Sequence, residues 1–75
     1  MAKLPRLNGK ELGKIIIKLG FVYSHTTGSH IIYKHPDSRK TTIPYHSGEE
    51  IGPGLLNKII KKDLRMTRKD FLKNI

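Results

Sequence analysis

Four histidines give this 75-residue chain its clearest chemical signal: His25, His30, His35 and His46. All four lie in or beside a central segment rich in β-branched and aromatic residues, which favours strands. Histidine exchanges protons near neutral pH, because its ordinary pKa is about 6.5. RNA offers a matching reaction that requires no metal. Its 2′-hydroxyl attacks the adjacent phosphorus once a base removes the proton, an acid protonates the leaving 5′-oxygen, and cations stabilise the developing charge.

His30 stands out by its position directly after Gly28 and Ser29. Glycine lets the backbone bend tightly and approach a phosphate closely, and the Ser29 hydroxyl can donate a hydrogen bond to one. Basic residues that could hold an RNA backbone follow nearby: Lys34, Arg39 and Lys40. A three-residue pattern occurs by chance in many proteins, however. On this pattern alone His30 is either a proton-transfer group or a polar residue that begins a strand.

Other chemistry receives less support from the spacing. Histidines five apart on one strand point to opposite faces, so neither His25 with His30 nor His30 with His35 could chelate a metal from one strand. A metal site would have to join residues from different strands, and we expect none. Glu49 and Glu50 could act as an acid and a base, but adjacent side chains diverge, which favours a solvated loop.

Three tyrosines, Tyr23, Tyr33 and Tyr45, fall one on each expected strand. They could stack on nucleic acid bases or fill the core. Residues 31–33 are all apolar, so the pattern leaves open which face of the sheet His30 occupies.

A helix is expected before these strands. Asn8 followed by Glu11 has the spacing of a reciprocal helix cap, which predicts a start at about Gly9, and Gly20 supplies the stop. Apolar residues recur on one face and lysines on another: Leu12, Ile15, Ile16 and Leu19, and Lys10, Lys14 and Lys18. The lysines form either a solvated face or a ridge that contacts phosphates.

The central segment predicts a three-stranded meander. Residues 21–27 and 29–35 form a hairpin, Pro36 and Asp37 suit the next turn, and residues 40–46 form the third strand. Pro44 has no N–H to donate, so this third strand cannot be hydrogen-bonded on both sides at that point.

Helices follow the strands. Pro53 suits a first helical position after the glycine-rich loop at residues 47–54. A second helix is marked by Leu55, Leu56, Ile59 and Ile60, and its other side carries Lys58, Lys61 and Lys62. Thr67 and Asp70 repeat the capping spacing, so residues 68–75 predict a third helix whose Phe71, Leu72 and Ile75 close over the core. This order predicts an α+β fold, in which helices pack on one face of a three-stranded antiparallel sheet.

Composition bounds the function. We expect residues 1–75 to form a single domain, without cysteines to stabilise it. Residues 1–10 lack the apolar stretch of a secretory signal, which favours a cytoplasmic protein without a membrane span. Fifteen Lys and Arg against six Asp and Glu give a net charge of +9, which suits nucleic acid as a partner. An acidic protein partner, or a basic surface that only confers solubility, remains an alternative.

Three segments together resemble the HicA toxins of prokaryotic toxin–antitoxin modules, from about Leu7 to the end: LNGKELGKIIIKLGF, GSHIIYKHPDSRKTTIPYH and EIGPGLLNKIIKK. The helix start, G-S-H, H-P-D, T-T-I-P-x-H and the glycine before the second helix come in the family's order and spacing.

The resemblance implies a fold like that of double-stranded-RNA-binding domains and an endoribonuclease that cleaves messenger RNA without a metal or other cofactor. It also implies a HicB-type antitoxin that covers the active site. The family's catalytic histidine falls on His30, with Gly28 and Ser29 as its neighbours. Where the family often has a basic residue before that glycine, this chain has His25 and Thr26. The second proton-transfer group is not implied, and our candidates are His46 and His35, with solvent or a lysine as alternatives. The competing hypotheses are a non-catalytic double-stranded-RNA-binding module and a purely structural partner of an acidic protein.

Overall fold

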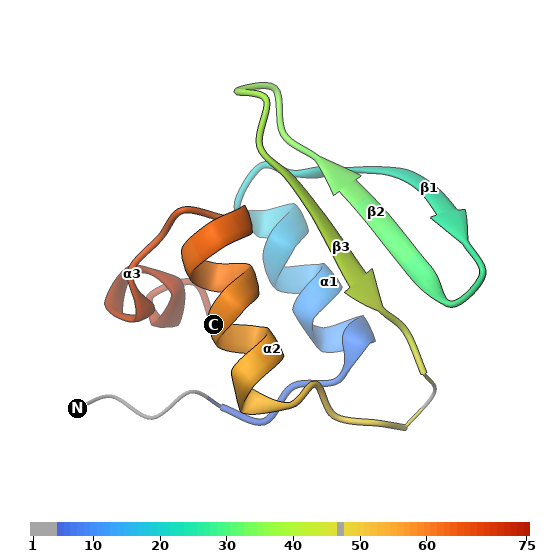
Figure 1. Ribbon diagram of the computed structural model, residues 1–75. Coiled ribbons are helices and arrows are strands. Elements are labelled where there is room, and N and C mark those ends of the chain that lie inside the picture. Colours follow the sequence, from blue (N-terminus) through green and yellow to red (C-terminus); the bar gives the residue numbers. More distant parts are fainter. Residues whose placement is uncertain (1–4, 47) are drawn as a thin grey trace.

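The computed structural model describes residues 5–46 and 48–75 and confirms the predicted α+β fold (Figure 1). Its elements are α1 (Gly9–Lys18), β1 (Val22–Thr27), β2 (His30–Lys34), β3 (Lys40–Pro44), α2 (Pro53–Lys58), η1 (Ile59–Asp63) and α3 (Arg68–Leu72). This topology is compatible with the fold of double-stranded-RNA-binding domains. Two sequence expectations touch residues outside the described ranges, namely Ser47 of the glycine-rich loop and the first four residues.

α1 begins where the sequence predicts because its first turn is capped. The Asn8 side chain accepts a hydrogen bond from the N–H of Glu11 (2.8 Å), and the Glu11 carboxylate accepts one from the N–H of Asn8 (3.0 Å). After the helix, Gly20 adopts a φ of 99°, a left-handed conformation that favours glycine and redirects the chain into β1. The predicted apolar face packs into the core, and the three lysines are exposed.

The strands pair in the order β1-β2-β3, as an antiparallel meander. Thr27 pairs with His30 across the two-residue loop Gly28–Ser29. Gly28 has a φ of 59°, as expected for a two-residue hairpin turn with glycine at its first central position. The loop therefore fixes the register of the two strands, and with it the face on which each side chain lies.

β3 is an edge strand, as the missing N–H of Pro44 predicted. It ends at Pro44 and not at His46 as expected, although the Tyr45 N–H still donates to the Ser29 carbonyl (2.6 Å). A Cβ added at Gly9 would lie 2.9 Å from the Pro44 carbonyl oxygen. The start of α1 therefore sits directly against the end of β3, and the chain turns away from the sheet there.

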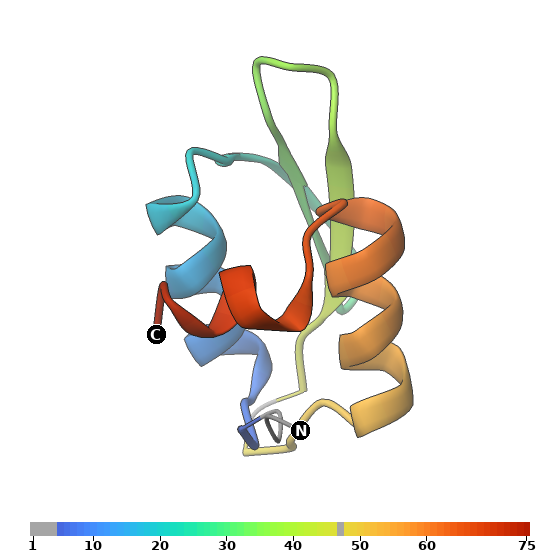
Figure 2. The same cartoon turned by 90° about the vertical axis from the view of Figure 1, so that its left-hand side faces the viewer.

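The helices cover one face of the sheet and leave the other open (Figures 1 and 2). Residues paired across antiparallel strands share a face. Two such pairs pack under the helices: Ile31 with Ile43, and Tyr33 with Thr41. His30, Ile32 and Lys34 alternate with these residues along β2, so they point to the open face. Ile32 is buried without belonging to the core cluster beneath the helices, which agrees with this placement.

The segment after α2 differs from the regular second helix that was expected. α geometry holds to Lys58, and Ile59–Asp63 then forms a π-helical turn in which the Leu64 N–H donates to the Ile59 carbonyl (2.9 Å). The adjacent Ile59 and Ile60 of this turn are both buried in the core, where each is at most 1% exposed.

α3 begins at Arg68 as predicted but ends at Leu72, short of the expected residue 75, and it carries a core residue. The Thr67 hydroxyl accepts a hydrogen bond from the Asp70 N–H (3.1 Å), which caps the helix. Phe71 is fully buried and Leu72 is half-buried. Ile75, however, is 56% exposed, so the expectation that it closes over the core is wrong.

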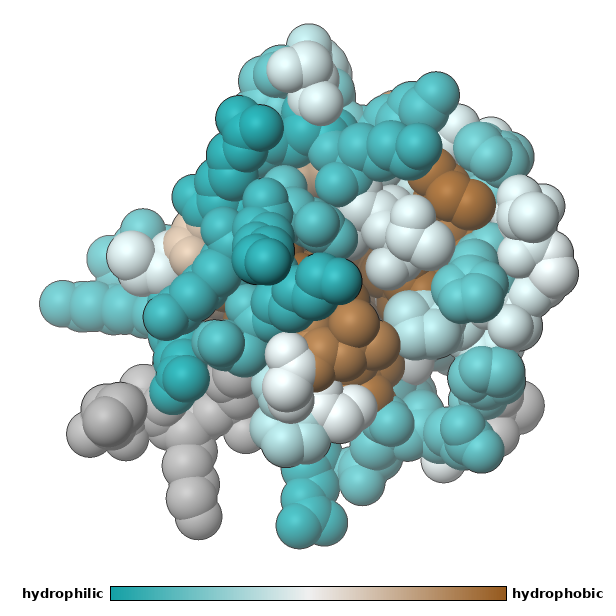
Figure 3. Space-filling model, viewed as in Figure 1, coloured by the Kyte–Doolittle hydropathy of each residue, from teal (hydrophilic) through white to brown (hydrophobic). Residues whose placement is uncertain are grey.

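On the side shown in Figure 3, hydrophilic residues predominate and hydrophobic residues form small patches. Leu55 is one of the exposed apolar residues, although the sequence pattern placed it with the apolar side of α2. In the described part of the chain, no helix is both long and apolar enough to cross a membrane.

Gly13 lies at the closest contact between α1 and the sheet. A Cβ added there would lie 2.6 Å from the Tyr33 hydroxyl oxygen, far inside normal contact distance. Gly13→Ala is therefore expected to lower the free energy of unfolding by about 1–3 kcal/mol, as overpacking in a core does. Helix propensity alone predicts the opposite sign, since alanine is favoured over glycine by about 1 kcal/mol.

Tyr33→Phe provides the matched background for this measurement. Without the hydroxyl, the nearest Tyr33 ring carbon would lie 3.5 Å from the new Cβ, which is an ordinary contact. In the Tyr33→Phe protein, Gly13→Ala should be neutral or stabilising in urea denaturation. An equal cost in both backgrounds would show that the hydroxyl contact does not set the helix–sheet distance.

Candidate active site

His30 is the first residue of β2 and is exposed on the open face of the sheet. Its two cross-strand partners are Thr27 on β1 and Pro44 on β3. Neither neighbour carries a charge or a bulky group that would cover the imidazole. The face of His30, which the apolar run in β2 left undecided, is thus set by the sheet register, and the ring is open to a large ligand.

The Gly28–Ser29 loop places its backbone beside His30. Gly28 is exposed, and a Cβ added to it would meet no atom within 4 Å. Open space therefore surrounds the loop on that side. The Ser29 carbonyl is already engaged by the Tyr45 N–H, which ties the loop to the end of β3. Both residues lie where a phosphate close to His30 could contact them.

Two lysines face each other on the same open face. Lys34 on β2 pairs with Lys40 on β3, and both are exposed. Like charges directly opposite each other in a sheet are destabilising, so this pair gains from an anion that lies between them. Lys34 is four residues from His30 along β2, about 13 Å at 3.3 Å per residue. The open face therefore carries an imidazole at one end and paired cations at the other.

Arg39 is engaged within the protein. Its Nε donates to a carboxylate oxygen of Asp37 (2.7 Å), and its Nη1 donates to the Leu64 carbonyl (2.6 Å). The guanidinium also lies 5.2 Å from the centre of the Phe21 ring. Partial desolvation acts to raise the pKa of Asp37, but the hydrogen bonds from Arg39, with the nearby His35, outweigh it and lower that pKa below its usual range. Arg39 stabilises the β2–β3 turn rather than standing free on the open face.

His35 has a similar local role. Its Nδ1 lies within hydrogen-bond distance of the backbone nitrogen (3.1 Å) and a carboxylate oxygen (2.9 Å) of Asp37. Its ring packs edge-on against Phe21, with 4.9 Å between ring centres. His35 follows the end of β2, about 16 Å from His30 along the strand. The structure therefore does not bring His35 and His30 together.

His46 lies nearer to His30, beyond the end of β3, and is exposed. It lines a small hollow of about 240 Å³ with Tyr45, Gly48 and the start of α1, including Lys10. This hollow adjoins the helical side of the fold, whereas His30 points to the open face. His46 thus lies at the same end of the sheet as His30, two residues beyond Pro44, the cross-strand partner of His30.

His25 is the functional candidate that the sequence reasoning missed. It pairs with Ile32, which shares the open face with His30, so the two histidines lie on one face as diagonal cross-strand neighbours. The expectation that His25 and His30 face opposite ways is wrong, because the hairpin loop places them on different strands. A two-residue loop at Gly28–Ser29 would have revealed this from the sequence.

Across residues 5–46 and 48–75, no three side chains of His, Cys, Asp or Glu come together in a way that could hold a metal ion. Glu49 and Glu50 are exposed, and Glu50 forms a backbone bridge with Asn8. These carboxylates lie beyond β3, towards α1.

The tyrosines do not form a stacking platform on the open face. Tyr23 and Tyr33 pair across β1 and β2 on the helix face, with 6.3 Å between their ring centres. Burial, and then the neighbouring Tyr23, raise the pKa of Tyr33 above its ordinary value. Tyr45 lies just beyond β3 and not on a strand as expected. Tyr33 therefore serves the core.

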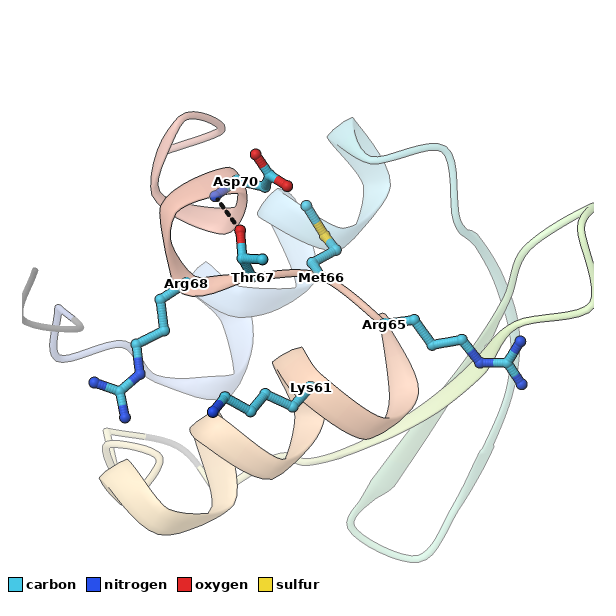
Figure 4. A pocket seen from close by; sticks show the side chains of 6 residues that line it. All are labelled: Lys61, Arg65, Met66, Thr67, Arg68 and Asp70. Carbon is cyan, nitrogen blue, oxygen red and sulfur yellow. Dashed lines mark hydrogen bonds between the residues drawn. The ribbon is translucent and has the colours of Figure 1, made fainter.

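A second, larger hollow lies on the helical side between η1 and α3 (Figure 4). It measures about 670 Å³ and is lined by Lys61, Arg65, Met66, Thr67, Arg68 and Asp70. Lys61 and Arg68 extend to one side and Arg65 to the other, so the cations do not converge on one point (Figure 4). No histidine lines this hollow, which separates it from the proton-transfer candidates of the open face.

Residues 9–64 match the model of the HicA toxin family of bacterial toxin–antitoxin systems. The match runs from the first residue of α1 to Leu64, the residue that follows η1. The chain belongs to this family. No curated protein matches it closely enough to be named as a relative. HicA membership makes the chain the toxin component of a toxin–antitoxin module and implies that its partner is an antitoxin. The matched segment includes the whole open face of the sheet, whereas α3 lies outside it.

Proposed function

We propose that this HicA protein is a metal-independent endoribonuclease that cleaves messenger RNA in the cytoplasm, with His30 as a proton-transfer group. The observation that carries the proposal is the exposed position of His30 on an open, cationic sheet face. A face without helices admits an RNA strand, and an unobstructed imidazole can reach the 2′-hydroxyl or the leaving oxygen. Family membership supplies the toxin role to which this chemistry corresponds.

In the proposed complex, the phosphates near the scissile bond lie beside the Gly28–Ser29 loop. Lys34 and Lys40 hold the backbone farther along the face, where the charge of RNA relieves the repulsion between them. Arg39 contributes by fixing the turn that carries Lys40. The RNA-binding role given to Arg39 from sequence is thus proposed in an indirect form, because its guanidinium is already engaged.

The direct test is incubation of the purified protein with single-stranded RNA in the presence of a chelator. The proposal predicts shortened RNA, whereas a non-catalytic double-stranded-RNA-binding module, the main alternative, would leave full-length RNA behind. A structural partner of an acidic protein would neither cut RNA nor bind it in a salt-dependent way. Intact RNA after chelation, with cleavage restored by a divalent ion, would contradict the metal-independent mechanism.

We also propose a HicB-type antitoxin as the specific partner. A net charge of +9 favours rapid association with an acidic protein, and burial of His30 would exclude RNA. Co-expression with the protein encoded by the adjacent reading frame should yield a complex that no longer cleaves RNA. A co-purified complex that cleaves RNA as fast as the free toxin would contradict active-site covering.

The lysine pair can be tested by salt dependence. In a His30→Ala protein, replacing Lys34 and Lys40 by alanine should weaken RNA binding and reduce the slope of log K against log salt by about 1.4, at about 0.7 per phosphate contact for single strands. The fold should not lose stability, because the substitutions remove two opposed like charges. Fluorescence anisotropy over a salt series gives the slope, and thermal unfolding gives the stability.

The control carries the same charge change on α1. Lys14 and Lys18 are exposed on the helical side, where the sequence left a phosphate-contacting ridge as an alternative. Their double alanine variant should change the slope much less than the sheet variant does. If the α1 variant changed the slope more than the sheet variant does, RNA would bind to α1 and not to the open face.

A further inference from the structure

We propose that His25 is the second proton-transfer group of this toxin, acting with His30 across the β1–β2 pair. The inference rests on the proposed ribonuclease function and adds the acid that protonates the leaving oxygen.

The placement follows from the strand register. Thr27 pairs with His30 and His25 pairs with Ile32, and directly paired residues share a face. His25 and His30 are therefore diagonal neighbours, with their Cα atoms about 7–8 Å apart. Both side chains are exposed. A phosphodiester lying across the two strands could present its 2′-hydroxyl to one ring and its 5′-oxygen to the other.

The environment of His25 suits a proton donor. The pairing of β1 with β2 is irregular between Tyr23 and His25, and at this point the Ser24 hydroxyl lies 3.0 Å from His25 Nδ1. In the imidazolium form, Nδ1 donates its hydrogen to Ser24 and Nε2 keeps a hydrogen free for transfer. Ser24 thus orients the ring. Among residues 5–46 and 48–75, the other titratable groups of the open face are His30, Lys34 and Lys40, and no helix packs against this face.

The other histidines fit the role less well. His35 lies at the far end of β2 and is engaged with Asp37 and Phe21. His46 lies beyond β3, beside the start of α1, where its hollow adjoins the helical side. His46 lies outside the strands, so the strand register that places His25 beside His30 does not place His46 there.

The proposed step is balanced without an external reagent. His30 removes the proton of the 2′-hydroxyl, and the 2′-oxygen forms a bond to phosphorus as the bond from phosphorus to the 5′-oxygen breaks. The His25 imidazolium gives its Nε2 proton to that 5′-oxygen. The products are a 2′,3′-cyclic phosphate and a 5′-hydroxyl, with one proton gained by His30 and one lost by His25.

Leaving-group chemistry separates an acid from a residue that only positions the RNA. One substrate is an oligoribonucleotide that the wild-type protein cleaves, and the other ends in a 3′-(4-nitrophenyl) phosphodiester, whose leaving group needs no proton. His25→Ala should lower kcat/KM on the first substrate by about 10²–10⁴ and lose the fall in rate at high pH. On the aryl substrate, its loss should be less than about tenfold. His30→Ala should be slow on both substrates.

Val22→Ala is the control, an exposed substitution on the same strand that should stay within about twofold of wild type. An equal loss for His25→Ala on both substrates would overturn the acid role, and so would full activity on RNA. If His46→Ala showed the large loss on RNA and the small loss on the aryl substrate that are expected of His25→Ala, the acid would be His46. Absence of cleavage by the wild-type protein would contradict the ribonuclease proposal itself, whereas full activity of His30→Ala would contradict the pairing of His25 with His30.

Discussion

His30→Ala is expected to lower kcat/KM for RNA cleavage by about 10²–10⁴ while leaving RNA affinity largely unchanged. The reason is that, in the proposed mechanism, His30 transfers a proton in the transition state, whereas Lys34, Lys40 and the Gly28–Ser29 loop hold the RNA backbone. Cleavage of an end-labelled RNA gives the rate, and anisotropy with the same RNA gives the affinity. In cells, expression of the variant should not arrest growth.

Folding controls make this result interpretable. His30 is exposed and forms none of the side-chain hydrogen bonds found among the described residues, so the substitution should change the free energy of unfolding by about 0.5 kcal/mol or less. His30→Gln keeps a polar side chain but cannot act as a general base, and it should be as slow as the alanine variant. If either variant cleaves RNA at the wild-type rate, His30 is not the proton-transfer group.

Phe71→Ala is expected to have the largest effect on stability. The ring is fully buried in the core, and such a truncation typically costs about 3–5 kcal/mol. A chain of this length has a total stability of about 4–11 kcal/mol, at 0.05–0.15 kcal/mol per residue. The variant should therefore be partly or wholly unfolded at 37 °C, as urea denaturation and circular dichroism would show.

Ile75→Ala is the matched control within the same segment. Ile75 is 56% exposed, so its truncation should be nearly neutral. The comparison matters because the family match ends at Leu64, before α3 begins. If Phe71→Ala costs no more than Ile75→Ala, α3 is not part of the folding unit.

Local features of the fold were predictable because each depends on a short-range rule. The Asn8–Glu11 cap, the stop at Gly20 and the Thr67 cap all involve groups at most a few residues apart. The edge position of β3 followed from the missing N–H of Pro44. The π-helical turn was not predictable in this way. Within Ile59–Asp63, no proline, glycine or capping residue marks the change from α to π geometry.

The candidate site was predicted less completely than the fold. His30, Lys34 and Lys40 were identified from sequence, but their common face required the register of the sheet. Arg39 shows the opposite case. Its bond to the Leu64 carbonyl joins residues 25 positions apart, so no local pattern could show that its guanidinium is engaged. The position of His25 could have been predicted from the sequence. A two-residue loop at Gly28–Ser29 determines which residues of the two strands are paired, and therefore which side chains share a face.

The opposed Lys34–Lys40 pair has a consequence for the lifetime of the toxin in the cell. Repulsion between the two ammonium groups leaves the unliganded chain less stable than the same fold with an anion bound between them. Any ligand that binds only the folded form shifts the equilibrium away from the open states that proteases attack. Toxin bound to RNA or to an acidic antitoxin should therefore be degraded more slowly than free toxin. The same two lysines would thus make the rate of degradation depend on whether the toxin has a ligand bound.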